Sequence, residues 1–359
     1  MNKWFNIIIL AALVLASCAK VEVVSSPERA VSFQVGSYAQ QTRADGDPVS
    51  LNSVGITSFS SRAYLHAAGL MDQAQNFFGE NGETISYQAA DNAVTWVPSH
   101  DYFWPKSATS YVNFISWLGG NPAISYAKDG DTWKATFAWE DVEVSDTDLM
   151  WADMAWRYNA NVNPATYGEY NGVAEGVPTL FHHALAQVCF LAGLTKATDE
   201  GVSWSVKLKS LSLSDVYGKG SLSMTNADPG EKKPQAWTFE GWKSLEGSAA
   251  IATETEKTFT TTAVDTVLGW TSVIPQEVNA DMELTVTFDV VTTYTTGPVV
   301  TEPVTANVAL SDFSATVAEW GMGQRITYTI LINPDTRMIT IIPVGKDWVT
   351  EPTYNISVE

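Results

Sequence analysis

Cysteine is scarce in this chain of 359 residues, which contains only Cys18 and Cys189. Cys18 ends an apolar N-terminal segment of the kind that is removed on export, which would leave Cys189 as the one remaining thiol. A single thiol cannot form an intramolecular disulfide, so the fold must depend on its hydrophobic core. Cys189 lies in the apolar run LAQVCFLAG, which predicts a buried, inert thiol rather than a nucleophile.

Basic residues are also few: 20 lysines and arginines stand against 40 aspartates and glutamates, for a net charge of −20. Nucleic acids and anionic lipid headgroups bind through positive charge, and this balance argues against both as partners. Charged residues make up only 17% of the chain. Together with abundant Thr, Ser, Val, Tyr and Trp, this composition is typical of an exported β-rich surface protein and not of a disordered one.

Motifs for catalysis or metal binding are missing. The chain has four histidines, His66, His100, His182 and His183, and no nucleophile elbow, HExxH, CxxC or glycine-rich phosphate loop. The adjacent pair lies in a strand-like run, where the two rings are expected on opposite faces and cannot share one metal. The acidic run of residues 140–153 lacks the spacing of an EF-hand and predicts a solvated face. We expect no cofactor, no metal and no enzyme, although paired carboxylates of a hydrolase leave no local pattern in a sequence.

Only the N-terminus, MNKWFNIIILAALVLASC, contains a sustained hydrophobic run. Its apolar part, about residues 5–16, is shorter than the roughly 20 residues of a spanning helix and suits a signal peptide over residues 1–17. The closing LASC resembles a bacterial lipobox, which would make Cys18 the lipidated first residue. An ordinary signal peptide with a chance cysteine is the alternative. Membrane attachment is then expected through lipid alone.

Alternation of apolar and polar residues dominates the rest of the chain and predicts an all-β fold. The runs ELTVTFDVV (283–291) and RITYTILIN (325–333) place every second residue on one apolar face. In LKSLSLSDV, Leu208 lies out of phase with Leu211 and Leu213. A dozen or more such runs, at intervals of 8–15 residues, favour β-sandwiches over alternating strands and helices.

The pattern departs from strands in two places. Residues 63–78, AYLHAAGLMDQAQNFF, form the one plausible helix, with a loop leading into a strand as the alternative. Residues 157–178 are rich in Asn, Gly and Pro and predict a boundary between two domains, which we place at residues 44–172 and 173–359. Two β-sandwiches in series are the simplest interpretation.

Tryptophan is abundant, with 14 residues. Exposed tryptophans could stack on sugars and would suit a glycan-binding surface. Trp96, Trp139, Trp204 and Trp270 lie within strand patterns, however, where burial in a sandwich core is the default.

Six segments occur in order along the chain: TWVPSHDYFWP (95–105), DLMWA (148–152), LFHHALAQVCF (180–190), IPQ (274–276), WGMGQRITYTILI (320–332) and GKDW (345–348). Taken together, they resemble the fimbrillin family of type V pilins and associated fimbrial lipoproteins. The resemblance implies two transthyretin-like β-sandwich domains. It also implies a lipoprotein precursor of the outer membrane that a trypsin-like, Arg-specific protease cleaves at the cell surface. Subunits of the fimbrium then assemble by exchange of strands.

In that scheme the first strand of the N-terminal domain is removed with the propeptide, here residues 18–43. The run AVSFQVGSY (30–38) is the expected removable strand, with Val31, Phe33 and Val35 on one face. Burial of three such side chains is worth roughly 5–8 kcal/mol, and loss of the strand would expose unpaired backbone groups that another strand could bind.

Three Arg-Ala pairs could be the processing site. Cleavage after Arg29 would leave the first strand in place, and cleavage after Arg62 would damage the second. Arg43 lies in a polar segment between strands, so we expect cleavage between Arg43 and Ala44. The alternative is an exposed arginine that is never cut.

The C-terminal TYNISV repeats the alternation of the first strand, with Tyr354, Ile356 and Val358 on one face. It follows Pro352, which would separate it from the strand before. The segment is either the donor strand for another subunit or a local edge strand of its own domain.

These expectations favour a structural or adhesive component of a type V fimbrium, with its position as stalk subunit, anchor or tip left open. Its partners would be other fimbrial subunits, the protease, and a receptor or glycan on a host or bacterial surface. A monomeric, glycan-binding surface lipoprotein is the alternative.

Overall fold

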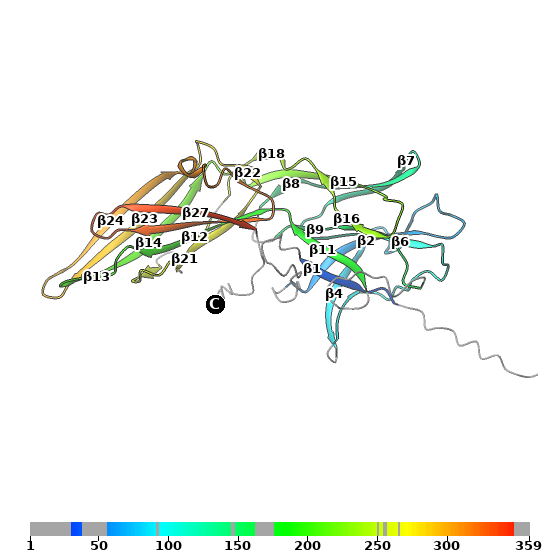
Figure 1. The fold of residues 1–359 in the computed structure, drawn as a ribbon, viewed down its shortest axis with the longest axis horizontal. Coiled ribbons are helices and arrows are strands. Elements are labelled where there is room, and N and C mark those ends of the chain that lie inside the picture. Colours follow the sequence, from blue (N-terminus) through cyan, green and yellow to red (C-terminus); the bar gives the residue numbers. More distant parts are fainter. Residues whose placement is uncertain are drawn as a thin grey trace, which may run out of the picture.

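A computed structural model describes residues 30–37, 56–90, 93–144, 148–161, 176–249, 251–253, 257–264 and 266–347. Strands account for nearly all regular structure in them, so the all-β class is confirmed. Figure 1 shows an elongated molecule with the N-terminal strands at one end and the last strands at the other. No helix within the described ranges is long and apolar enough to cross a membrane.

A 10-stranded sheet forms the N-terminal end, and its pairings run in the order β16-β10-β6-β9-β11-β1-β5-β4-β2-β3. Because β6 also pairs with β2, seven of these strands close a ring: β1, β5, β4, β2, β6, β9 and β11. The ring strands are β1 (Phe33–Ser37), β2 (Ser58–His66), β4 (Glu83–Ala90), β5 (Ala93–Pro98), β6 (Tyr111–Leu118), β9 (Met150–Ala152) and β11 (Val177–His183). The additional strands are β3 (Gln75–Asn76), β10 (Met154–Tyr158) and β16 (Lys233–Gln235).

Side chains from all seven ring strands meet in one buried cluster, which we call the ring core. Its members include Val31 just before β1, Phe33 on β1, Phe59 on β2, Phe114 on β6 and Phe181 on β11. Each of the seven strands therefore has a neighbour on both sides, although β1 pairs with β5 at only one position.

A smaller sheet covers part of the outer face of the ring. Its strands are β7 (Ala123–Asp129), β8 (Thr132–Glu143), β15 (Lys219–Ala227), β17 (Thr238–Phe239) and β18 (Lys243–Glu246). Ile115 and Trp117 of β6 pack here against Phe137 of β8 and Met224 of β15. The run YVNFISWL of β6 is therefore almost continuously buried, because each of its faces meets a different core.

The C-terminal end is a sandwich of two sheets. One contains β19 (Ala252–Thr253), β21 (Thr266–Val273), β12 (Ala186–Leu194), β26 (Gln324–Ile332) and β27 (Ile339–Asp347). The other contains β13 (Thr198–Asp199), β14 (Val202–Ser214), β20 (Thr258–Phe259), β23 (Glu283–Tyr294) and β24 (Val299–Ala309). A short pair, β22 (Gln276–Glu277) with β25 (Glu319–Trp320), lies beside them.

Alternation predicted the faces of these strands correctly. The inward residues of β23 and β26 are buried in the sandwich core, as expected: Leu284, Val286, Phe288, Val290, Ile326, Tyr328, Ile330 and Ile332. Leu208 and Leu211 are both buried although they are out of phase, because the pairing of β14 with β23 shifts register between Leu208 and Ser210. A bulge therefore resolves the phase conflict in the sequence.

The helix expected over residues 63–78 was a wrong prediction. β2 continues through His66, and a turn follows in which the amide of Leu70 donates to the carbonyl oxygen of Ala67. Gly69 adopts a positive φ of 81°, which a helix does not tolerate. Pairing of β2 with β6 over seven positions outweighs the helix propensity of the alanines and leucines.

The boundary between residues 172 and 173 lies outside the described residues, and the division into two domains stays a prediction. The 10-stranded sheet and the covering sheet each contain strands from both sides of that position. β8 pairs with β15, and β10 pairs with β16. Arg157 and Asp228 also join the two sides through two hydrogen bonds of 2.8 Å.

Candidate functional site

β1 occupies an interior position between β11 and β5. It pairs in parallel with β11 from Phe33↔Val177 to Ser37↔Phe181, and antiparallel with β5 at Phe33↔Trp96. Figure 1 shows β1 lying beside β11. β5 and β11 do not pair with each other among the described residues, so β1 is the strand that joins them and closes the ring.

The residues just before β1 are bound on both sides as well. The amide of Val31 donates to the carbonyl oxygen of Tyr102 at 2.8 Å, and the amide of Val177 donates to the carbonyl oxygen of Ser32 at 2.8 Å. Ala30 forms a bridge with Phe103. β11 thus pairs with β1 along its length, whereas β5 and the loop after it hold only the start of the strand and the residues before it.

The ring of Phe33 is the main anchor of β1. It lies edge-on to Phe59, with the ring centres 5.6 Å apart, and edge-on to Phe114, at 5.5 Å. Val31 and Phe33 are 2% and 3% exposed, whereas Val35 is only half-buried. We call the space that β1 fills, between the edges of β5 and β11 and above these rings, the β1 seat.

Gly176 leaves room for β1 at the start of β11. A Cβ atom there would lie 2.7 Å from the backbone nitrogen of Gln34 and 2.7 Å from the carbonyl carbon of Phe33. Backbone atoms could move away from such a contact only if the strand pairing were distorted. Glycine at this position therefore allows the two segments of the chain to approach closely.

A cluster of polar side chains fixes the loop that binds the start of β1. The carboxylate of Glu83, on β4, is 7% exposed and accepts hydrogen bonds from the hydroxyl groups of Ser99 and Tyr102, the latter at 2.8 Å. The Nδ1 atom of His100 lies 3.1 Å from the same carboxylate. We call these four residues the Glu83 latch. The ring of Tyr102 packs on Phe78, 4.7 Å between centres, and Phe78 contacts Phe33 in turn.

The latch favours an ionised Glu83. Burial pushes the pKa of Glu83 upward, but hydrogen bonds from Ser99, Tyr102 and His100 outweigh it and leave that pKa below its ordinary value of 4.5. Burial and the bond to Glu83 raise the pKa of Tyr102 to about 12, so Tyr102 remains a donor at neutral pH. This cluster could not be predicted from the sequence, because its four residues come from the start of β4 and the loop after β5 and follow no motif.

The fimbrillin-like family matches this sequence over residues 42–348. The chain belongs to the fimbrillin-like family. This membership supports a role as a fimbrial or adhesion component at the cell surface, associated with other fimbrial subunits.

Solved structures similar to this fimbrillin-like chain include two fimbrial proteins. One, from Bacteroides vulgatus, is 14% identical, with 89% of this chain and 100% of that chain covered and a TM-score of 0.45. The other, the fimbrial anchor protein Mfa2 from Porphyromonas gingivalis, is 10% identical, with 90% and 99% covered and a TM-score of 0.28. No curated protein matches the sequence.

Several predicted site residues of the fimbrillin-like chain lie outside the described ranges. They are Cys18, Arg43 and Ala44, and the C-terminal Tyr354, Ile356 and Val358. Of the competing arginines, Arg62 lies in the middle of β2, opposite Ile115 of β6, with its guanidinium bonded to the carbonyl oxygen of Ile124. A cut there would divide a strand of the ring.

The histidine pair binds two different carboxylates. His182 stacks on Trp151, 4.2 Å between ring centres, and lies 3.0 Å from Asp153. His183 is nearly enclosed and lies 2.5 Å from Asp148. Asp148 and Asp153 belong to the acidic run of residues 140–153, so part of that run partners histidines instead of facing solvent. Within the described ranges, no group of three or more metal-binding side chains occurs.

Cys189 is less buried than expected, whereas most of the tryptophans predicted for the core are buried. Cys189 on β12 is half-buried, and burial raises the pKa of its thiol, which keeps it protonated at neutral pH. Trp96, Trp139 and Trp204 are buried as expected, and Trp270 is half-buried. No tryptophan in the described part of the chain is exposed.

Truncation of the anchor should loosen the ring. Phe33→Ala removes a buried ring that contacts Phe59 and Phe114, and it should lower the free energy of unfolding by about 3–5 kcal/mol. Denaturant unfolding of the uncleaved chain measures this. Val299→Ala, at a side chain that is 62% exposed, is the control and should change stability by less than about 0.5 kcal/mol. Equal effects of the two variants would contradict the assignment of Phe33 as the anchor.

The Glu83 latch should make the β1 seat sensitive to acid. Because the pKa of Glu83 is lowered in the folded protein, its stabilising effect is complete above pH 4.5 and is lost as pH falls through the folded value. Glu83→Gln should therefore lower the melting temperature at pH 7, and the deficit should shrink towards pH 3. The exposed Glu319→Gln serves as control. A Glu83→Gln deficit that is the same at pH 7 and pH 3 would refute a role for the ionised carboxylate.

Proposed function

We propose that the chain is a subunit of a type V fimbrium whose first strand is exchanged, after cleavage between Arg43 and Ala44, for a strand of another subunit. The observation that supports this most is the position of β1. It closes the ring of seven strands, yet it lies outside the family match over residues 42–348.

Cleavage at Arg43 would separate β1 from the rest of the chain. β1 ends at Ser37 and β2 begins at Ser58, so a cut after Arg43 falls between them and divides no strand of the ring. The segment before Arg43 holds both Cys18 and β1. One cut therefore removes the lipidated N-terminus and opens the β1 seat together.

Energetics favour exchange once the link is cut. Burial of Val31 and Phe33 is worth about 3–6 kcal/mol, and a free energy of that size corresponds to a dissociation constant of roughly 6 mM to 0.04 mM for the free peptide. Before cleavage the tether keeps β1 at an effective concentration of the order of millimolar, which exceeds the dissociation constant over the tighter part of that range. After cleavage the fragment dissociates on dilution, because its concentration falls below the dissociation constant.

The empty seat would bind an extended strand of matching pattern. The edges of β5 and β11 would offer unpaired backbone groups, and the rings of Phe59 and Phe114 would be exposed below them. A donor must supply apolar side chains at alternate positions. The C-terminal Tyr354, Ile356 and Val358 have this spacing, and 12 residues follow Asp347, where β27 ends, with a reach of about 40 Å when extended.

Arg-specific proteolysis tests the cleavage step. Treatment of the full chain should produce a new N-terminus at Ala44 and a ladder of oligomers on unboiled gels. Arg43→Ala should abolish both, whereas Arg29→Ala should behave as the wild type. A new N-terminus at Ala30, or a ladder from Arg43→Ala, would show that the proposed site is wrong.

A charge on the donor face tests the second step. Ile356→Asp should leave cleavage at Arg43 intact and prevent the ladder, because a carboxylate would enter the apolar β1 seat. Asn355→Asp places the same charge on the opposite face and should still form ladders. Ladders of equal length from both variants would instead favour a local edge strand at the C-terminus.

A further inference from the structure

One sheet of the C-terminal sandwich has an apolar outer face. In the sheet that contains β21, β12, β26 and β27, alternate residues such as Val188 and Phe190 fill the sandwich core, and the residues between them point outward. Strand pairing places these outward side chains in rows across the sheet. The apolar ones are Val267, Trp270, Cys189, Leu191, Leu331, Ile342 and Val344. We call this surface the C-terminal outer face.

These side chains are open to solvent to different degrees. Ile342 and Val344, on the edge strand β27, are 46% and 40% exposed. Met338, in the turn before β27, is 66% exposed. The other members are half-buried. The outward residues of a β-sandwich are ordinarily polar, and an apolar patch at the surface marks a contact with another molecule.

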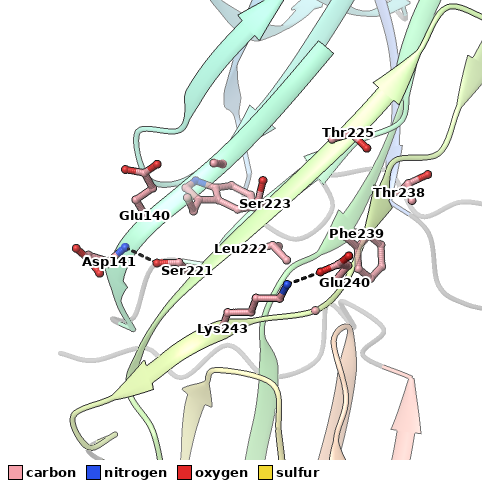
Figure 2. A pocket seen from close by; sticks show the side chains of 13 residues that line it. Glu140, Asp141, Ser221, Leu222, Ser223, Thr225, Thr238, Phe239, Glu240 and Lys243 are labelled. Carbon is pink, nitrogen blue, oxygen red and sulfur yellow. Dashed lines mark hydrogen bonds and ion pairs between the residues drawn. The ribbon is translucent and has the colours of Figure 1, made fainter. Parts of the chain in front are cut away.

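The other outward sheet faces supply the contrast. The outward residues of β23 and β24, in the second sheet of the same sandwich, are nearly all polar and include Thr285, Thr287, Asp289, Thr301, Thr305 and Asn307. The covering sheet is polar outside as well, with Ser223 and Thr225 near the carboxylates of Glu140 and Asp141 (Figure 2). The apolar character is therefore particular to one face and is not a general property of the surface.

The charges on the C-terminal outer face are basic. Arg325 and Lys346 pair at one end of it, and the Nε atom of Arg325 donates to the side-chain oxygen of Gln187 at 2.6 Å. Among the described residues of these four strands, no Asp or Glu occupies an outward position. The whole chain has a net charge of −20, so a second copy of it is complementary in charge to this face.

The face also ends where the proposed donor segment begins. β27 ends at Asp347, one residue after Lys346, and residues 348–359 follow. This length of chain spans at most about 40 Å when it is fully extended. A subunit that takes up the segment in its β1 seat is therefore held within that distance of the end of the face.

The size of the face fits a supporting contact. β12 and β26 pair over eight positions, and four strands of that length, spaced about 4.8 Å apart with a rise of about 3.3 Å per residue, cover roughly 500 Å². A stable interface buries roughly 800 Å² on each partner, so this face alone is too small to hold two uncut chains together. Once a donated strand connects two subunits, the second contact becomes intramolecular and needs little affinity of its own.

We propose that the C-terminal outer face packs against the next subunit of the fimbrium, a second copy of this chain. The apolar side chains of β27 and β12 are buried against that copy, and Arg325 and Lys346 contact its acidic surface. The inference rests on the proposed function, because strand exchange brings the two copies together. The added contact fixes the orientation of one subunit relative to the next.

Cys189 is a built-in reporter of this contact, since it lies on the face and is half-buried. Its alkylation is measured at alkaline pH, because burial raises the pKa of the thiol, and is followed by mass spectrometry of the peptide that contains it. In ladders produced by Arg-specific cleavage, Cys189 should react at least about fivefold more slowly than in the uncut monomer, because the next subunit covers it.

A charge in the apolar part of the face should remove this protection. Ile342→Asp should leave cleavage and ladder formation intact, because β27 is not part of the β1 seat, and return the alkylation of Cys189 to the monomer rate. Thr305→Asp is the matched control. It introduces the same charge at an exposed position of β24, the edge strand of the polar sheet, and should keep the protection of the wild type. If Ile342→Asp lowers the melting temperature, Lys346→Glu, at an exposed side chain, gives the same comparison.

Failure of this contact and failure of strand exchange give different results. Ladders in which Cys189 reacts at the monomer rate, or equal protection in Ile342→Asp and Thr305→Asp, would overturn the contact and leave strand exchange standing. If no ladder forms, strand exchange is wrong, and the uncut chain at high concentration tests the contact alone. The alkylation rate should then fall as the concentration rises, and a constant rate would overturn the contact. Protection by anionic lipid vesicles, without protection by second copies, would assign the face to a membrane and likewise overturn it.

Discussion

The interaction on which the N-terminal half depends is the placement of β1 between β5 and β11. One strand closes a ring of seven, and it does so with two well-buried side chains, Val31 and Phe33. The neighbours of β1 come from distant parts of the sequence, with Val177 paired in parallel on one side and Trp96 antiparallel on the other. The ring core therefore depends on a segment that residues 38–57 connect to β2.

The proposed strand exchange requires a strand that closes the ring while other elements build the space it fills. The aromatic floor of the β1 seat is made by Phe59, Phe78 and Phe114, which belong to other elements and stay when β1 leaves. Any strand with apolar side chains at alternate positions can cover that floor and satisfy the same backbone groups. The Glu83 latch acts on the loop beside β1 and not on β1 itself. It fixes the geometry of the seat without being specific for the side chains of the strand that occupies it.

Much of the fold could be predicted from the sequence because alternation reports burial directly. The faces of β23 and β26, and the burial of Trp96, Trp139 and Trp204, follow from that pattern alone. The helix over residues 63–78 was predicted wrongly because local propensity contains no information about β6, the partner that holds β2 extended. The ring closure and the Glu83 latch could not be predicted for the same reason, since each joins residues that are distant in the sequence. The proposed cleavage at Arg43 and the proposed donor residue Ile356 are inferred from the sequence pattern and the family resemblance. The position of β1 supports both proposals.

The most direct measurement of the central claim is native mass spectrometry of the chain after cleavage at Arg43. If β1 is a separable part of the ring, complexes of two or more chains should have lost the fragment that ends at Arg43, one fragment for each occupied junction. The uncut chain should remain a monomer with its full mass. Cleaved chains that keep the fragment bound at all concentrations and stay monomeric would contradict the account.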